Sequence, residues 1–274
     1  MKITAEVAPG VACGDGLPML VIAGPCVLGS REEAVETAIT LRDACRRMGY
    51  GYVFKASFDK ANRTNAKAHR GPGIATGLET LAAVKQAAGV PVTTDIHLPE
   101  QAAVVAEIVD LIQIPAFLCR QTDLLTAAGA AGRAVNVKKG QFMSPDGMRH
   151  AVDKIRAAGG MNVLLTERGT TFGYHNLVVD VRSIPEMRAH GVPVIIDATH
   201  SVQKPGGLGD ATGGDRGMVP WIMFAAVAAG ADGVFSETLP DPSRSPSDSE
   251  NMVPLAELPA LLLKAGRIRA IVRG

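Results

Sequence analysis

Cysteine and aromatic residues are scarce in this chain of 274 residues. Phe, Trp and Tyr make up only 4% of it, and the cysteines are limited to Cys13, Cys26, Cys45 and Cys119. No two of these form a C-x-x-C pair, and four widely spaced cysteines do not make a disulfide framework in a chain of this length. We therefore expect reduced thiols, which are typical of a cytoplasmic protein.

An excess of charge of either sign is also lacking. The formal net charge is +1, so no basic field indicates a nucleic acid or an anionic membrane as a partner. The N-terminus lacks the basic flank and apolar core of a signal peptide, and the longest apolar stretch, 221–229, is too short to span a bilayer. We expect a soluble cytoplasmic protein in which a local cluster recognises any phosphate.

What the chain does contain is a repeated alternation of strand-like and helix-like segments. Eight short apolar runs rich in Val, Ile and Leu lie at 19–23, 52–56, 90–94, 111–114, 134–137, 163–166, 192–197 and 233–235. Helix-like segments lie at 30–48, 78–88, 99–110, 123–131, 148–158, 219–229 and 255–272. This alternation predicts an α/β fold, a (β/α)8 TIM barrel formed as a single domain over 1–274. An open doubly wound sheet is the alternative, but no G-x-G-x-x-G follows the first strand.

Three segments fall outside this alternation. Residues 1–18 are expected to form a short N-terminal cap over the floor of the barrel. Segments 203–217, with six glycines, and 240–251 follow the seventh and eighth strands. Long loops on the rim that carries a barrel's active site are typical of lids and binding loops, so we expect a mobile cover.

Reactive side chains follow almost every predicted strand. In a closed barrel the carboxyl ends of all strands meet at one rim, and strands one, seven and eight are neighbours. Cys26, His200 and Glu237 end these three strands, and Asp248 lies in the loop after the last. A thiolate, an imidazole and two carboxylates suit Zn²⁺, Fe²⁺, Mn²⁺ or Co²⁺. Taken singly, a cysteine or a histidine at such a place is more often a scaffold residue.

Cationic side chains form a second group at or just after strand ends. They are Lys55, Lys60, Arg63, Lys138, Lys139 and Arg168. One subcluster around Lys138 and Arg168 and another around Arg63 would suit two separate phosphates, because guanidinium and ammonium groups bind phosphate oxygens. A surface basic patch is the simpler alternative, and an imine-forming Lys55 or Lys138 is another. Asp95 and His97 are either an acid–base pair or a carboxylate that orients its neighbour.

The motifs together resemble the family of 3-deoxy-D-manno-octulosonate 8-phosphate synthases. They are YVFKASFDKANRT (52–64), RGPG (70–73), TDIH (94–97), IQIPAFLCRQTD (112–123), NVKKGQF (136–142), TERGTTFGYHNLVVD (166–180), DATHSVQ (197–203) and SETLPDP (236–242). The K-A-N-R-[ST] pattern separates this family from the related 3-deoxy-heptulosonate 7-phosphate synthases. The resemblance implies condensation of phosphoenolpyruvate with arabinose 5-phosphate in lipopolysaccharide precursor synthesis. A heptulosonate synthase using erythrose 4-phosphate, an imine-forming lyase and a non-catalytic sugar-phosphate sensor stay open.

The same resemblance implies roles for individual residues. Lys138 and Arg168, with the backbone of Ala116 and Phe117, would bind the phosphate of phosphoenolpyruvate, and Lys55 and Lys60 its carboxylate. Asn62, Arg63 and Thr64 would bind the pentose phosphate, and Gln113 also belongs to the substrate site. The implied catalytic residues are Lys60, Asp95, His200 and Asp248.

Two further properties follow from the family. Cysteine at the end of strand one, here in AGPC, is similar to the metal-dependent branch, whereas asparagine marks the metal-independent branch. The implied metal ligands are Cys26, His200, Glu237 and Asp248. The family is tetrameric, which implies a homotetramer in which Arg120 reaches the site of a neighbouring subunit.

Overall fold

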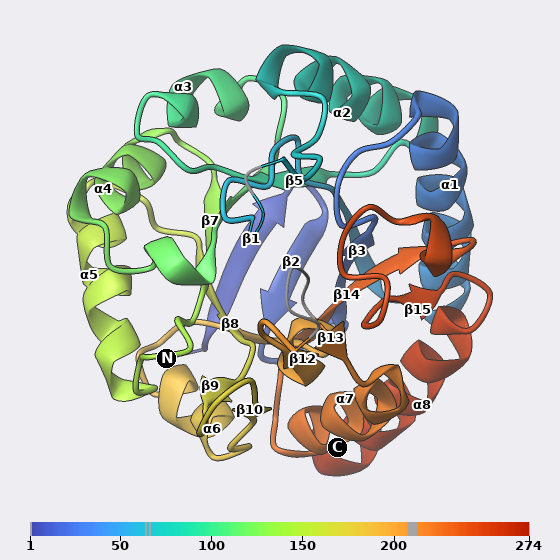
Figure 1. The fold of residues 1–274 in the computed structure, drawn as a ribbon. Coiled ribbons are helices and arrows are strands. Elements are labelled where there is room, and N and C mark those ends of the chain that lie inside the picture. The colour runs from blue at the N-terminus through green and yellow to red at the C-terminus, as the bar shows by residue number, and fades with distance from the viewer. Residues whose placement is uncertain (1, 64, 66, 208–212, 274) are drawn as a thin grey trace.

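Eight parallel strands close into a barrel in the computed structural model, which describes residues 2–63, 65, 67–207 and 213–273. The strands are β3 (Leu20–Gly24), β4 (Gly51–Lys55), β5 (Val92–Asp95), β6 (Leu111–Ile114), β7 (Ala134–Lys138), β8 (Val163–Glu167), β11 (Val194–Asp197) and β14 (Gly233–Leu239). They pair in chain order, and β14 closes the barrel by pairing with both β11 and β3 (Figure 1). The predicted (β/α)8 barrel is confirmed.

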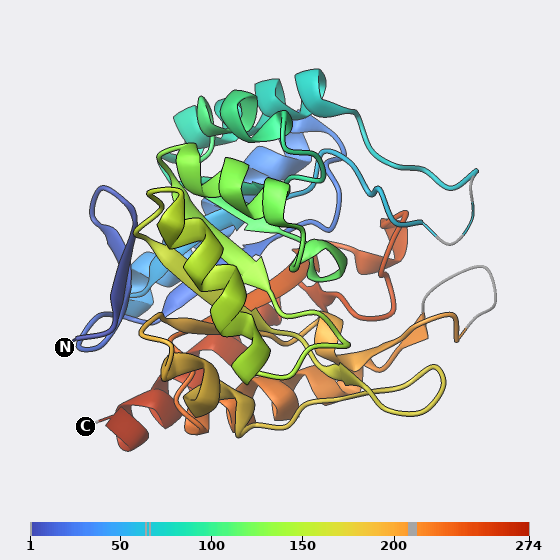
Figure 2. The ribbon, with the colours of Figure 1, turned by 90° about the vertical axis from the view of Figure 1, so that its left-hand side faces the viewer.

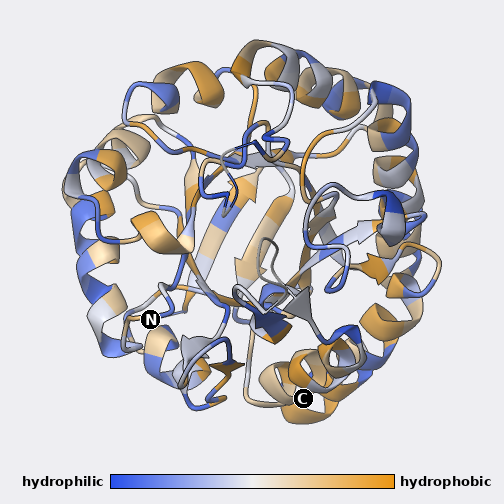
Figure 3. Ribbon diagram, in the orientation of Figure 1, coloured by the Kyte–Doolittle hydropathy of each residue, from blue (hydrophilic) through white to orange (hydrophobic). Residues whose placement is uncertain are grey.

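A ring of helices covers the outside of the barrel (Figure 1). It consists of α1 (Arg31–Met48), α2 (Ile74–Ala88), α3 (Gln101–Ala106), α4 (Thr122–Ala130), α5 (Arg149–Ala157), α6 (Ser183–Arg188), α7 (Val219–Ala228) and α8 (Leu258–Arg273). The predicted start of α1 is confirmed, because the Ser30 hydroxyl accepts a hydrogen bond from the Glu33 amide. Most helices carry hydrophobic and hydrophilic residues together, whereas α7 is hydrophobic along most of its length (Figure 3).

The N-terminal cap is an antiparallel hairpin of β1 (Thr4–Ala8) and β2 (Val11–Gly14). Its buried residues Ala5, Val7 and Cys13 pack against the lower layer of the barrel interior. That layer consists of Leu20, Ile22, Val53, Leu111, Ala134, Leu164, Ile195 and Phe235. The hairpin therefore closes the floor, and the long loops lie at the opposite end (Figure 2).

Short elements decorate the barrel. They are β9 (Thr170–Thr171), β10 (Leu177–Val178), β12 (Gln203–Lys204), β13 (Gly213–Gly214), β15 (Val253–Pro254), and the 3-10 helices η1 (Ala116–Leu118), η2 (Asp146–Met148), η3 (His200–Val202), η4 (Arg216–Met218) and η5 (Pro242–Arg244). Residues 208–212, the middle of the expected cover over the site, lie outside the described residues, so a closing lid stays a prediction. Across the described ranges, no helix is both long and apolar enough to cross a membrane.

A buried charge cluster joins the floor to both ends of the chain. Asp232, the residue before β14, is fully buried and pairs with Arg188 of α6 and with Arg273 of α8. Arg188 also contacts Asp15, which follows the hairpin, at 2.5 Å. The Asp232 carboxylate accepts a further hydrogen bond, of 2.8 Å, from the amide of Val194. One carboxylate thus connects the hairpin, two helices and the barrel.

We expect Asp232→Asn to lower the free energy of unfolding by about 3 kcal/mol, because two arginines then face a neutral group in a buried setting. Urea-induced unfolding at a fixed protein concentration measures this. Asp180→Asn is the control, since Asp180 and Arg182 form a surface pair whose side chains are 51% and 81% exposed. Equal losses in the two variants would contradict the assignment of Asp232 as the connecting group.

Candidate active site

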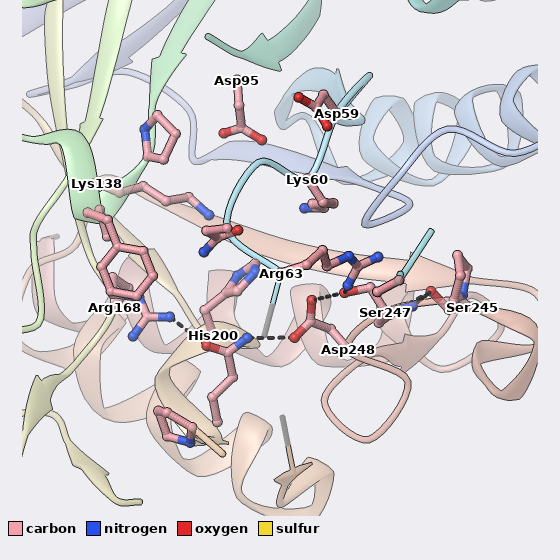
Figure 4. A pocket seen from close by; sticks show the side chains of 18 of the residues that line it. Asp59, Lys60, Arg63, Asp95, Lys138, Arg168, His200, Ser245, Ser247 and Asp248 are labelled. Atoms are coloured by element: carbon pink, nitrogen blue, oxygen red, sulfur yellow. Dashed lines mark hydrogen bonds between the residues drawn. The ribbon is translucent and has the colours of Figure 1, made fainter. Parts of the chain in front are cut away.

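A cavity of about 540 Å³ opens at the carboxyl end of the strands. The predicted site residues that line it are Lys55, Lys60, Asn62, Arg63, Asp95, His97, Ala116, Phe117, Lys138, Arg168, His200 and Asp248. Figure 4 shows their side chains converging from the barrel and from the loop that carries Ser245, Ser247 and Asp248. The strand ends therefore meet as the barrel geometry requires.

Three of the four expected metal ligands cluster tightly. The candidate ligand atoms of Cys26, Glu237 and Asp248 all lie within 4.8 Å of one another. Parallel pairing of β3 with β14 places Glu237 beside Gly24, and hence close to Cys26. The fourth residue, His200, lies outside this tight cluster, but its Nε2 is 3.5 Å from Glu237 Oε1.

The donor set of this cluster, with His200 beside it, fits a divalent cation. Sulfur and carboxylate donors with one nitrogen donor suit borderline metal ions. Glu237 Oε2 is buried and has no hydrogen-bond partner in the described part of the chain, so it is available as a ligand. Asp248 adopts a left-handed backbone conformation, with φ of 55°, and its Oδ2 lies 3.2 Å from the Cys26 sulfur.

Two lysines surround the Glu237 carboxylate. Its Oε1 lies 2.9 Å from Lys55 Nζ and 3.7 Å from Lys60 Nζ. Burial acts to raise the pKa of Glu237, but the charges of Lys55, His200 and Lys60 outweigh it and lower the pKa. Burial acts to lower the pKa of Lys60, but Cys26, Glu237 and the nearby aspartates outweigh it and raise the pKa. Both groups are therefore charged at neutral pH.

Burial also affects the pKa of the Cys26 thiol. Together with the charge of Glu237, it raises the pKa of Cys26 well above the ordinary value. A thiolate in this place needs an added positive charge beside it, which is what a metal ion supplies.

Asp197 was not predicted as a site residue, but its carboxylate contacts two residues that were. Its Oδ2 lies 2.7 Å from Lys138 Nζ and 2.7 Å from His200 Nδ1. Lys138 Nζ also lies 3.7 Å from the centre of the Phe235 ring, a cation–π contact. Burial acts to raise the pKa of Asp197, but His200 and Lys138 outweigh it and lower the pKa. Burial lowers the pKa of Lys138 even beside this partner, so an imine-forming Lys138 stays a prediction.

A row of hydrogen bonds inside the barrel converges on Asp95. Thr166 Oγ1 donates to Asn136 Oδ1 at 2.7 Å, and Asn136 Nδ2 donates to Gln113 Oε1 at 3.1 Å. Gln113 Nε2 then donates to Asp95 Oδ1 at 2.5 Å, while Ser57 Oγ donates to Asp95 Oδ2. Since both carboxylate oxygens accept bonds from the barrel, the geometry favours an orienting role for Asp95. Gln113 is fully buried beneath the cavity.

The two arginines of the cavity each keep an unpaired donor. Arg168 Nη2 donates to Gln203 Oε1 at 2.6 Å, and Arg63 Nη1 donates to Ser247 Oγ at 2.5 Å. Arg168 Nη1 and Arg63 Nη2 are both buried and have no hydrogen-bond partner among the residues that the structure describes. Each guanidinium can therefore donate to an anion in the cavity.

Of the other predicted residues that the structure describes, Cys26, Gln113 and Glu237 are buried and do not line the cavity, and neither do Arg120 and Lys139. Arg120 is exposed, and Thr64 lies outside the described residues. Lys139 was expected in the cationic group. Its side chain is buried, and Nζ donates a hydrogen bond to Thr170 Oγ1 at 2.9 Å. Its place one residue after β7 turns it away from Lys138, because successive side chains point to opposite sides of a strand.

Gln203 and Ser247 also line the cavity. They were not predicted as site residues, because the sequence indicates only loops for their segments. The sequence carries one weak signal for Asp197, a carboxylate at a strand end three residues before His200.

The fold and the site define a class of protein, the (β/α)8 barrels with a cavity lined by lysine and arginine side chains at the carboxyl rim. Within it, the chain belongs to the DAHP synthetase I family, whose model matches residues 1–270. A protein of Nitratidesulfovibrio vulgaris is 61% identical over 242 residues, which cover 88% of this chain and 89% of the relative. A Cyanothece protein is 52% identical over 267 residues, covering 97% and 98%, and a Trichlorobacter lovleyi protein is 52% identical over 272 residues, covering 99% and 100%. All three relatives are named 2-dehydro-3-deoxyphosphooctonate aldolase, which confirms the predicted resemblance.

The row that ends on Asp95 gives a test with a matched control. Thr166→Val removes a bonded hydroxyl and leaves Asn136 Oδ1 without its donor, so we expect a loss of about 1–2 kcal/mol in the free energy of unfolding. Thr93 is equally buried, but its hydroxyl has no partner in the described part of the chain, so Thr93→Val should cost nothing or stabilise. Urea-induced unfolding of both variants measures the difference. A larger loss in Thr93→Val would show that the row does not stabilise the barrel.

Proposed function

We propose that this protein condenses phosphoenolpyruvate with D-arabinose 5-phosphate and water to 3-deoxy-D-manno-octulosonate 8-phosphate and phosphate. It is a transferase, a 3-deoxy-8-phosphooctulonate synthase of lipopolysaccharide precursor biosynthesis. The names of relatives at 52–61% identity support this activity. The structural observation that carries it is the pair of guanidinium groups in one cavity, each with a buried, unpaired donor.

Phosphoenolpyruvate occupies the deeper part of the cavity. Arg168 and Lys138 bind its phosphate beside the backbone of Ala116 and Phe117, while Lys55 and Lys60 face its carboxylate. The buried ammonium and guanidinium groups support this placement, because fixed charges in a site of low dielectric bind anions strongly. Gln113, beneath the cavity, holds Asp95 in place.

The pentose phosphate occupies the outer part. Arg63 binds its phosphate, and Asn62 and Thr64 bind the sugar. Asn62 is exposed at the cavity wall, and Arg63 is anchored through Ser247, which leaves Nη2 for the phosphate.

The reaction forms one carbon–carbon bond and breaks one carbon–oxygen bond. The C3 carbon of phosphoenolpyruvate attacks the pentose aldehyde, and water adds to C2. The tetrahedral intermediate then releases phosphate by cleavage of the C2–O bond. Negative charge develops on the aldehyde oxygen, and Lys60 faces it as a protonated ammonium. Asp95, His200 and Asp248 are the further groups that orient reactants or move protons.

Cys26, His200, Glu237 and Asp248 would hold a divalent metal ion. The mixed donor set and the unpaired Glu237 Oε2 support Zn²⁺, Fe²⁺, Mn²⁺ or Co²⁺. When bound, such an ion would polarise a carbonyl oxygen or activate water. Asp197 supports the arrangement, since its contact with His200 Nδ1 leaves Nε2 directed toward Glu237.

Phosphate release tests the substrate pair and the metal together. We expect release from phosphoenolpyruvate with arabinose 5-phosphate, no comparable release with erythrose 4-phosphate, loss of activity on metal stripping, and recovery when divalent ions return. Activity that survives thorough stripping would keep the synthase assignment and overturn the metal requirement. Faster release with erythrose 4-phosphate would make the protein a heptulosonate synthase, and no release with either sugar would overturn the proposal.

The proposal extends to location and assembly. The protein acts in the cytoplasm as a homotetramer in which Arg120 completes a neighbouring site. Exposed apolar side chains support self-association, since Trp221 of the largely apolar α7 is 68% exposed and Phe172 is 66% exposed. Arg120 is exposed and outside its own subunit's cavity.

Mixed oligomers test the role of Arg120. Arg120→Ala chains lack the residue that serves a neighbour, and Arg168→Met chains lack a working site of their own. Each variant alone should be nearly inactive, whereas coexpressed chains should recover about a quarter of wild-type activity, since paired subunits exchange the same contacts. Light scattering reports the tetramer. Activity of the mixture no higher than the sum of the two variants would place Arg120 in its own subunit's site or outside any site.

A further inference from the structure

A continuous row of hydrogen bonds crosses the cavity between its two arginines (Figure 4). Arg168 Nη2 donates to Gln203 Oε1, and Gln203 Nε2 donates to Asp248 Oδ1, each at 2.6 Å. From the other side, Arg63 Nη1 donates to Ser247 Oγ at 2.5 Å, and Ser247 Oγ donates to Asp248 Oδ2 at 2.7 Å. The row begins and ends at the guanidinium groups of Arg168 and Arg63, each of which has an unpaired donor. Asp248, a candidate metal ligand, lies in its middle.

The chemistry of Gln203 suits the place between Arg168 and Asp248. A guanidinium only donates hydrogen bonds and an ionised carboxylate only accepts them, so the group between them must do both. The amide does, and its orientation is fixed by its two partners. A carboxylate at this position would repel Asp248, and a thioether would bond to neither neighbour.

The two loops that carry Gln203 and Asp248 are held together. Gln203 begins β12 and pairs with Gly214 of β13. A Cβ on Gly214 would lie 1.4 Å from Oδ1 of the buried Asn251, so only glycine permits this close approach. Arg216 Nη2 also donates to the Ser249 carbonyl at 2.6 Å. A shift of Gln203 is therefore transmitted to the segment that bears Asp248.

We infer that Gln203 is a positioning residue that couples the phosphate subsite at Arg168 to the metal-ligand carboxylate of Asp248. This inference rests on the proposed function. Phosphate binds through Arg168 Nη1 and leaves Nη2 on Gln203, so an anion that immobilises the guanidinium also immobilises the amide and the carboxylate behind it. Phosphoenolpyruvate and metal ion thus strengthen each other's binding, and the effect is reciprocal.

Cobalt titration of the metal-free, full-length protein tests the coupling without turnover. The cobalt–thiolate absorption reports binding at Cys26, with and without saturating phosphoenolpyruvate. In the wild type we expect the substrate to tighten Co²⁺ binding about tenfold. In Gln203→Met we expect Co²⁺ alone to bind about tenfold more weakly, and added phosphoenolpyruvate to leave its affinity unchanged. Phosphoenolpyruvate should still bind to metal-free Gln203→Met, because Arg168 and Lys138 remain.

Two further variants sharpen the result. Gln203→Glu keeps an acceptor for Arg168 but repels Asp248, so it should also lose the coupling, and it serves if Gln203→Met does not fold. Gln86→Met makes the same change on the exposed surface of α2 and should keep the wild-type coupling. Coupling that survives in folded Gln203→Met or Gln203→Glu, or independent binding of the two ligands in the wild type, would overturn the inference alone. A wild type that binds neither ligand would overturn the proposed function with it.

Discussion

Closure of the barrel by β14 is the constraint on which the site depends. This strand pairs with β3 on one side and with β11 on the other, so the carboxyl ends of the first and the last two barrel strands become neighbours. Cys26, His200 and Glu237 are distant in sequence and meet only through these two pairings. The hairpin at the opposite end closes the floor of the barrel interior with apolar side chains, so the cavity opens at the carboxyl rim.

Charge balance follows from that geometry. Burying one isolated ion costs several kcal/mol, so each buried acid in the site needs a partner of opposite sign. Glu237 has Lys55, and Asp197 has Lys138 and also contacts the His200 ring. These pairs hold the ammonium and imidazole groups in place before any ligand arrives, and this is the preorganisation that stabilises developing charge.

The fold and the strand-end residues could be predicted from the sequence because a barrel's pattern is local and its rim is shared. Each predicted apolar run overlaps one of the eight observed barrel strands, and most predicted site residues line the cavity. Hydrogen-bond partners that are distant in sequence and meet only between neighbouring strands or loops could not be predicted. Asn136 and Thr166 lie inside the neighbouring strands β7 and β8 and meet only because these strands pair, and Gln203 meets Asp248 only between two loops. The short helix α6 was missed because it contains Pro185 and only six residues.

A neutral group between Arg168 and Asp248 has a physical advantage over a direct ion pair. If the guanidinium bound the carboxylate directly, each charge would satisfy the other, and a phosphate and a metal ion would both have to break that pair. The Gln203 amide keeps the two charges apart while still bonding to both. Ser247 does the same on the side of Arg63. The cavity therefore keeps its cations available for anions and its carboxylate available for a cation, within one connected row.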